Sequence, residues 1–150
     1  MRWLAIGLAT FAMSAVPAYG RNLVEADLNF TPPKSVALVD MDTLKRGAGE
    51  ATIWSYLYDA GGESSKYVSV ILWSFDCKLS QIHYLSNNTY DINGTYLHSF
   101  PPQSGISYIV PGTVGDKIKA LVCDGKMPSQ ISVAGDQDPY TVIRTLIDYK

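Results

Sequence analysis

The stretch that most constrains the fold is residues 67–77, which read YVSVILWSFDC. It is the longest apolar, β-branched and aromatic run outside the N-terminus. A strand exposed on one face alternates with polar residues, whereas both sides of this one are apolar. We therefore expect a central strand whose second face is covered by sheet curvature, the C-terminal tail or a second copy of the protein. The two apolar sides are Ile71, Trp73, Phe75 and Cys77 on one and Val68, Val70 and Leu72 on the other.

The second cysteine, Cys123, ends the clearest helix pattern in the chain. A Pro-Gly pair precedes Thr113, a good N-cap, and Asp116 three residues later approximates a capping box. Gly125 is placed to end the helix. On an ideal helix Cys123 lies opposite the apolar stripe, so we expect it in a frayed last turn. The stripe consists of Val114, Ile118, Leu121 and Val122.

Two cysteines in an exported chain most simply form one disulfide, which here would pin the strand to the helix. A bridge closing so long a loop stabilises by roughly 4 kcal/mol in the chain-entropy model. A reactive thiol pair is the alternative, but the chain has neither CxxC spacing nor a flanking basic cluster.

Export is indicated by residues 1–20, which have the three parts of a secretory signal peptide. Arg2 gives the positive charge, residues 4–16 form the apolar core, and small residues stand before the expected cleavage point after Gly20. A retained anchor helix is the alternative, but spanning a bilayer needs about 20 apolar residues.

The remaining chain is long enough for one domain with a real core. It contains no further membrane span. After removal of the signal peptide with Arg2, the chain has 11 Lys and Arg and 14 Asp and Glu, which gives a net charge near −3. A mildly acidic protein does not suit nucleic-acid or anionic-membrane binding. Ten tyrosines favour a β-rich exported protein.

Further strands are predicted at residues 36–39, 51–58, 81–90, 95–100 and 104–110, with a short one near 22–26. Turn signals separate them at residues 40–44, 47–49 and 61–65 and at Asn93-Gly94, the strongest hairpin signal.

The tail, residues 126–150, has a helix start at Asp138-Pro139. Apolar residues follow at helical spacing, although a final strand is the alternative.

Candidate metal sites are weak. Asp40, Asp42 and Glu50 suggest a calcium loop, which fails because Lys45 replaces the required Gly and Ala51 the required carboxylate. A turn explains these residues better.

His83 and His98 would be ligands only if their strands pair, and two histidines without a third ligand are weak. Strand histidines that are partly exposed are the preferred interpretation. We predict no metal, no cofactor and no catalytic residue, since no GxSxG, HExxH, P-loop or GxGxxG motif occurs.

Two asparagines, Asn87 and Asn93, begin glycosylation sequons, which matter only in a eukaryotic secretory pathway. Turn positions are the ordinary explanation. The tyrosines offer contact surface of the kind found at interfaces, but packing in the core explains them equally well.

Three segments resemble the surface-adhesin protein E-like domain of Gram-negative bacteria. They are residues 36–44 (VALVDMDTL), residues 67–77 ending in FDC, and residues 109–115 (IVPGTVG) followed by Val122-Cys123. The resemblance covers residues 36–123. It implies an antiparallel sheet with a C-terminal helix tethered by a Cys77–Cys123 disulfide. The type member is a dimeric, lipid-anchored outer-membrane adhesin that binds host matrix and serum proteins.

We therefore predict an α+β fold: one antiparallel sheet of about six strands, the tethered helix on one face and a short tail helix. The expected domains are a signal peptide (1–20), the adhesin-like domain (21–125) and the tail (126–150).

The expected function is that of a non-catalytic binding module contacting matrix or envelope proteins through an aromatic-rich sheet face, with a homodimer as one arrangement. The alternative is a periplasmic structural or envelope-accessory domain without a host ligand. The chain lacks the cysteine for a lipid anchor, which favours a periplasmic or secreted protein over surface display.

Overall fold

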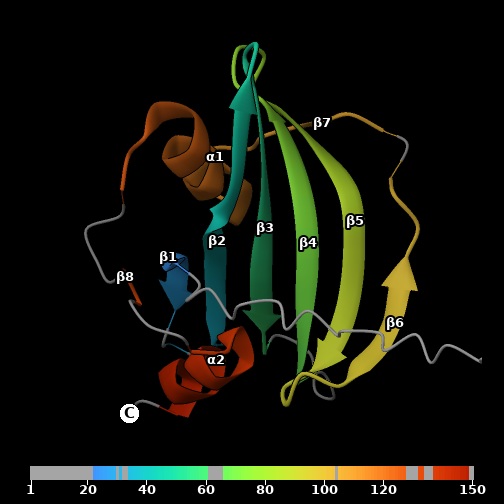
Figure 1. Ribbon diagram of the computed structural model, residues 1–150, viewed down its shortest axis with the longest axis vertical. Coiled ribbons are helices and arrows are strands. Elements are labelled where there is room, and N and C mark those ends of the chain that lie inside the picture. Colours follow the sequence, from blue (N-terminus) through green and yellow to red (C-terminus); the bar gives the residue numbers. More distant parts are fainter. Residues whose placement is uncertain are drawn as a thin grey trace, which may run out of the picture.

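A computed structural model describes residues 22–29, 31, 34–60, 66–103, 105–127, 132–133 and 137–148. Within this part, eight strands form one antiparallel sheet and two helices pack on it (Figure 1). The elements are β1 (Leu23–Asn29), β2 (Ser35–Gly47), β3 (Glu50–Asp59), β4 (Tyr67–Asp76), β5 (Gln81–Asp91), β6 (Tyr96–Phe100), β7 (Ser107–Tyr108), α1 (Val114–Asp124), β8 (Ser132–Val133) and α2 (Pro139–Asp148).

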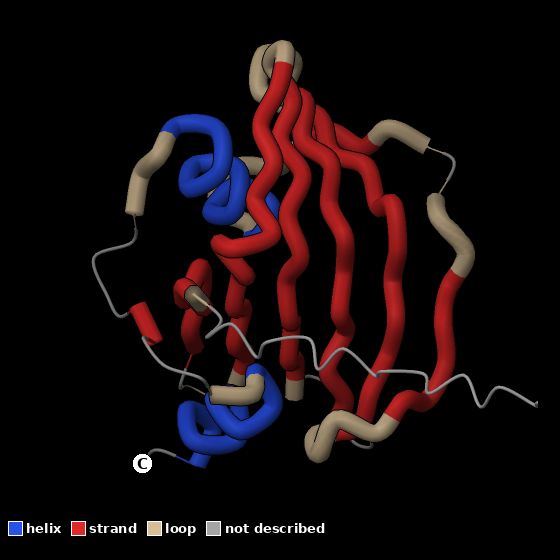
Figure 2. The backbone as a smooth tube through the Cα atoms, in the orientation of Figure 1, coloured by secondary structure: helices blue, strands red, loops and turns tan. Residues whose placement is uncertain are grey.

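The strand order is β6-β5-β4-β3-β2-β1-β8, so each long strand pairs with its neighbour in sequence. The short β7 lies off this path and pairs with β5. Figure 2 shows the chain continuing past the end of β6 and, further along the sequence, coming back to the sheet. The predicted α+β fold is confirmed, and β4 is an interior strand between β3 and β5.

Burial changes face halfway along the central strands. In β3 the buried positions are Ala51, Ile53 and Ser55 and then, on the other face, Tyr56 and Tyr58. In β4 the change falls between Val70 and Ile71, both of which are buried. Each face of the sheet is therefore covered over only about half its length.

The helix α1 covers one of these halves, on what we call the α1 face. Its buried residues Ile118, Leu121 and Val122 pack with Trp73 and Phe75 of β4. The capping prediction is confirmed: the Thr113 hydroxyl accepts from the Asp116 N–H, and Gly125 ends the helix at φ 67°. However, the last turn is regular through Cys123 rather than frayed.

The helix α2 covers the other half, on what we call the α2 face. Val142 and Ile143 pack with Val68 and Val70 of β4, so the C-terminal tail is the element that covers the second apolar side of residues 67–77. The alternative of a final strand is wrong for residues 139–148. Asp138 is the cap, because its carboxylate accepts from the Thr141 N–H at 3.0 Å. Figure 1 shows α1 and α2 at opposite ends of the sheet.

The predicted turn at residues 40–44 is wrong. These residues lie inside β2, where the pairing with β3 is irregular between Asp40 and Lys45. The Thr43 hydroxyl donates to the Asp40 carbonyl at 2.6 Å and accepts from the Trp54 N–H at 3.1 Å. Side-chain bonds of the kind that predict a turn here stabilise a bulge in a continuous strand.

The strand predicted over residues 104–110 is reduced to the two residues of β7. The hairpin at Asn93-Gly94 is confirmed, but among the described residues there only Gly94 has a positive φ, of 88°. It is therefore a three-residue loop with a left-handed glycine instead of a two-residue turn. The predicted signal peptide and the 61–65 loop lie outside the described residues.

Candidate binding surface

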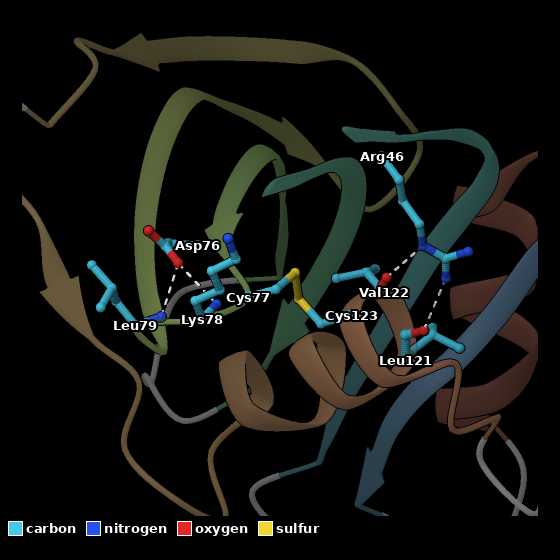
Figure 3. Close-up of a disulfide and its surroundings, with 8 residues drawn as sticks. All are labelled: Arg46, Asp76, Cys77, Lys78, Leu79, Leu121, Val122 and Cys123. Atoms are coloured by element: carbon cyan, nitrogen blue, oxygen red, sulfur yellow. Dashed lines mark hydrogen bonds between the residues drawn. A yellow bond between two sulfur atoms is a disulfide. The ribbon is translucent and has the colours of Figure 1, made fainter. Parts of the chain in front are cut away.

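The end of the sheet beside α1 is held by one disulfide and by several hydrogen bonds. The disulfide joins Cys77, just beyond β4, to Cys123 in α1, with the two Cα atoms 5.5 Å apart. Because Cys77 stands past the strand end, a cysteine on the flank of α1 reaches it (Figure 3). The Arg46 guanidinium donates to the Val122 carbonyl at 2.6 Å. These contacts fix the C-terminal end of the helix over the sheet.

The turn that follows β4 is also fixed. The carboxylate of Asp76 accepts from the backbone N–H groups of Lys78 and Leu79, at 2.9 and 2.8 Å (Figure 3). The Cys77 N–H donates to the Gly49 carbonyl at 2.9 Å, which joins this turn to the β2–β3 turn. These contacts make this corner a scaffold that fixes the position of α1 on the sheet.

The opposite edge of the sheet is exposed to solvent. All five residues of β6 and both residues of β7 are exposed. Among the described residues, six of the ten exposed large apolar side chains come from residues 96–110. Exposed apolar side chains gathered along one sheet edge mark an interaction site more often than scattered single residues do. Here they lie on both sides of the edge: Tyr96 pairs with Tyr90 on the α2 face, and Phe100 pairs with Asn87 on the α1 face. We call this set the edge strip: Tyr96, Leu97, Phe100, Ile106, Tyr108 and Val110.

The edge strip is anchored to the interior through aromatic contacts. The ring of Tyr96 lies edge-on to Tyr90, with centroids 5.7 Å apart, and Tyr90 lies 5.7 Å from Tyr140 of α2. The Ser99 hydroxyl donates to the side-chain oxygen of Asn88 at 2.6 Å. The β6 end of the strip is thus presented by packed side chains, which lowers the entropy lost on binding.

The hairpin that leads into β6 is held by Asp91. Its carboxylate accepts from the backbone N–H groups of Thr95 at 2.8 Å and Asn93 at 2.9 Å. These bonds lower the pKa of the Asp91 carboxyl, and the bond from the Thr95 N–H makes the largest contribution. The charged form of Asp91 therefore supports the turn geometry at neutral pH.

Two hollows lie on the α1 face beside the strip, and both include Tyr84 of β5. One, of about 320 Å³, lies between β5, β7 and the start of α1 and also includes Trp73, Tyr108 and Thr113. The other, of about 450 Å³, is lined by Tyr84, Asn87, Phe100, Pro101 and Gln103. Both are within the size range of small-molecule sites.

The two histidines are kept apart. Although β5 and β6 pair, His83 lies opposite Ser74 on the α2 face and His98 lies opposite Thr89 on the α1 face. Across the described ranges, no group of three or more His, Cys, Asp or Glu residues is placed to hold a metal ion.

The two aspartates of the rejected calcium loop accept hydrogen bonds from backbone N–H groups. Asp42 accepts from the Asn22 N–H at 2.9 Å and Asp40 from the Asp42 N–H at 3.2 Å. Of the sequon residues, Asn87 lies within β5 and only Asn93 lies in a turn.

No local sequence pattern identifies the edge strip as a set. The apolar pattern predicts an ordinary strand over residues 95–100, and an edge position cannot be read from that pattern alone. The sequence signals that regular pairing ends there are Pro101 and Pro102, which follow Phe100, together with Gly105.

In the part of the chain that the structure describes, neither helix has the length and apolarity needed to cross a membrane. A family model described as "Surface-adhesin protein E" matches residues 28–124. This range contains both cysteines, α1 and the whole edge strip. No curated protein and no solved structure matches the chain.

Proposed function

The chain belongs to the surface-adhesin protein E family, and on this basis we propose that it is an exported, non-catalytic module that binds a protein partner through the edge strip. Membership implies an exported surface protein. The particular compartment, the partner and the absence of catalysis belong to the proposal.

The observation that carries the proposal is the apolar character of an open sheet edge. Tyr108 is 74% exposed and Leu97 51% exposed, although both are residues that folding usually buries in part. An edge strand also offers backbone groups to a partner. An aromatic surface beside such an edge supports binding to an extended protein segment, with the side chains giving area and the backbone giving register.

The test is a pull-down of matrix proteins and envelope extract with the purified protein and with a Leu97→Ser/Tyr108→Ser double variant. We expect the wild type to retain a partner and the double variant to retain at least about tenfold less, since each removed side chain should contribute about 1 kcal/mol or more.

The matched control is Leu79→Ser/Met127→Ser. Both residues are 60% exposed and lie outside the strip, so this variant should bind as the wild type does. Loss of binding in the control, or a wild type that retains nothing above background, contradicts the proposal. In that case the gene is deleted, and adhesion and envelope integrity are measured. Unchanged adhesion together with altered envelope integrity supports the alternative of an envelope-accessory domain.

A second copy of the chain is the other protein that the strip would accept. Sedimentation of the wild type and the Leu97→Ser/Tyr108→Ser variant tests this directly. A dimer that dissociates only in the variant assigns the strip to self-association.

A further inference from the structure

The outer edge of β5 is paired at both ends and open in the middle. Toward one end Asn87 and the residues after it pair with β6, and toward the other Gln81 and Ile82 pair with β7. In the described chain no strand pairs with residues 83–86 on this side. Four residues span about 14 Å at 3.4 Å each. Because β6 and β7 close this gap at both ends, an added strand cannot extend past it, and the gap suits a small molecule.

A β-bulge directs side chains to this gap. Tyr84 lies opposite Trp73, and Asn87 lies opposite Ile71, both on the α1 face. Residues three apart on a regular strand point to opposite faces, but the register shift beside Leu72 brings these two to the same face. Bulges are frequent beside binding sites because they redirect side chains in this way.

The resulting hollow has two aromatic walls. Tyr84 is backed by the Trp73 ring at 4.8 Å, and Phe100 is in contact with the His98 ring at 4.7 Å. The described residues that line it carry no charged group: they are Tyr84, Asn87, Phe100, Pro101 and Gln103.

Polar atoms beside the hollow lack partners. Asn87 lines it, and its Oδ1 atom is buried without a hydrogen bond. Thr89, next on the same face, is 2% exposed, and its hydroxyl is also without a partner. A buried unpaired polar atom costs about 1–3 kcal/mol, and such atoms in a native protein call for an explanation. Since Asn87 Oδ1 has no partner to lose, turning that amide toward the hollow breaks no bond.

These features select the chemistry of the ligand. A charged ligand would be buried without a counter-charge, and a purely apolar one would leave the amides unpaired. A neutral polyol ring with an apolar C–H face satisfies both aromatic walls and both amides. We propose that the hollow lined by Tyr84, Asn87, Phe100, Pro101 and Gln103 binds a neutral saccharide of one or two units, whose C–H face packs on Tyr84 and Phe100 and whose hydroxyls bond to Asn87 and Gln103.

The test is saturation-transfer NMR of the full mature protein with methyl β-glucoside, methyl β-galactoside, methyl N-acetyl-β-glucosaminide and lactose. Sialic acid and a neutral tripeptide serve as the charged and peptide comparisons. We expect transfer to at least one neutral glycoside, strongest at its ring C–H protons, and none to the comparisons. No transfer to any neutral glycoside, or equal transfer to sialic acid or the tripeptide, overturns the proposal.

Variants locate the site. Asn87→Leu removes the unpaired amide at nearly constant volume, so it should weaken glycoside binding about tenfold without lowering the melting temperature. Phe100 is exposed, so Phe100→Ala should leave the stability of the fold nearly unchanged and weaken glycoside binding by a similar factor.

The control is Leu97→Ala, which removes a side chain of the same 51% exposure from the same strand but does not line the hollow. Unchanged binding in Asn87→Leu, or equal losses in Leu97→Ala and Phe100→Ala, contradicts the assignment. Phe100 belongs to both the edge strip and the hollow, so Asn87→Leu is the variant that separates glycoside binding from the protein partner: Asn87 lines the hollow and is not part of the strip.

Discussion

Glu25 of β1 holds a carboxylate where neighbouring positions are apolar. It lies opposite the fully buried Leu38 and is itself 7% exposed. Its Oε2 atom is buried without a hydrogen-bond partner. Burial, and after it the negative charge of Asp27, raises the pKa of the Glu25 carboxyl.

This shift gives the stability of the protein a defined pH dependence. The pKa of this carboxyl is higher in the folded than in the unfolded protein. Its contribution to stability is therefore fully present below the unfolded-state pKa, and it is lost as the pH rises through the folded-state pKa. We predict that Glu25→Gln is more stable than the wild type at about pH 7 by roughly 1 kcal/mol, with a smaller difference at about pH 4. Urea unfolding at the two pH values measures it.

Glu50→Gln is the control for Glu25→Gln. Glu50 is exposed at the start of β3, so the same chemical change there should leave stability nearly unaltered at both pH values. A Glu25→Gln protein less stable than the wild type at neutral pH would show that the carboxylate is stabilising, contrary to the structure.

At the scale of elements, α2 is docked on the β5–β6 hairpin as well as on the sheet. The guanidinium of Arg144 donates to the Ile92 carbonyl at 2.8 Å. Gly94 lies directly under Tyr140, and a Cβ atom added to Gly94 would stand 2.8 Å from a ring carbon of Tyr140. The hairpin that leads into the edge strip and the C-terminal helix therefore form one packed unit.

We predict that Gly94→Ala destabilises the protein more than Gly112→Ala does. Both glycines have positive φ, 88° and 82°, so both substitutions incur a backbone cost of about 1–2 kcal/mol. Only at Gly94 does the new methyl group also meet a packed side chain, because nothing lies within 4 Å at Gly112. The extra loss should be about 1–3 kcal/mol in urea unfolding, and equal losses would show that α2 does not press on the hairpin.

The elements that the sequence predicted best are those with strong local signals. The two-sided apolarity of residues 67–77, the cap at Thr113 and the Asp138-Pro139 helix start each correspond to an observed feature. Residues 40–44 were mistaken for a turn because their side chains bond to the backbone in either case. The pairing of β5 with both β6 and β7, and the bulge that joins Tyr84 to Asn87, depend on long-range register that no local pattern contains.

At the scale of the whole molecule, the two helices leave the edge strip uncovered. The cluster under α1 is centred on Ile118, Leu121 and Phe75, and that under α2 on Ile143 and Val68. Both helices contact the β1–β3 side of the sheet, and neither makes extensive contact with β6. The apolar surface of β6 and β7 is therefore available to another molecule while the core stays closed.

The central claim, that a partner binds at the edge strip, is tested most directly by hydrogen exchange of the protein with and without the partner recovered in the pull-down. We predict slower exchange of backbone amides in Tyr96–Phe100 and Ser107–Tyr108, with no change in Leu23–Asn29 or Pro139–Asp148. Protection confined to β1 or α2, with the β6 and β7 amides unchanged, would contradict the claim.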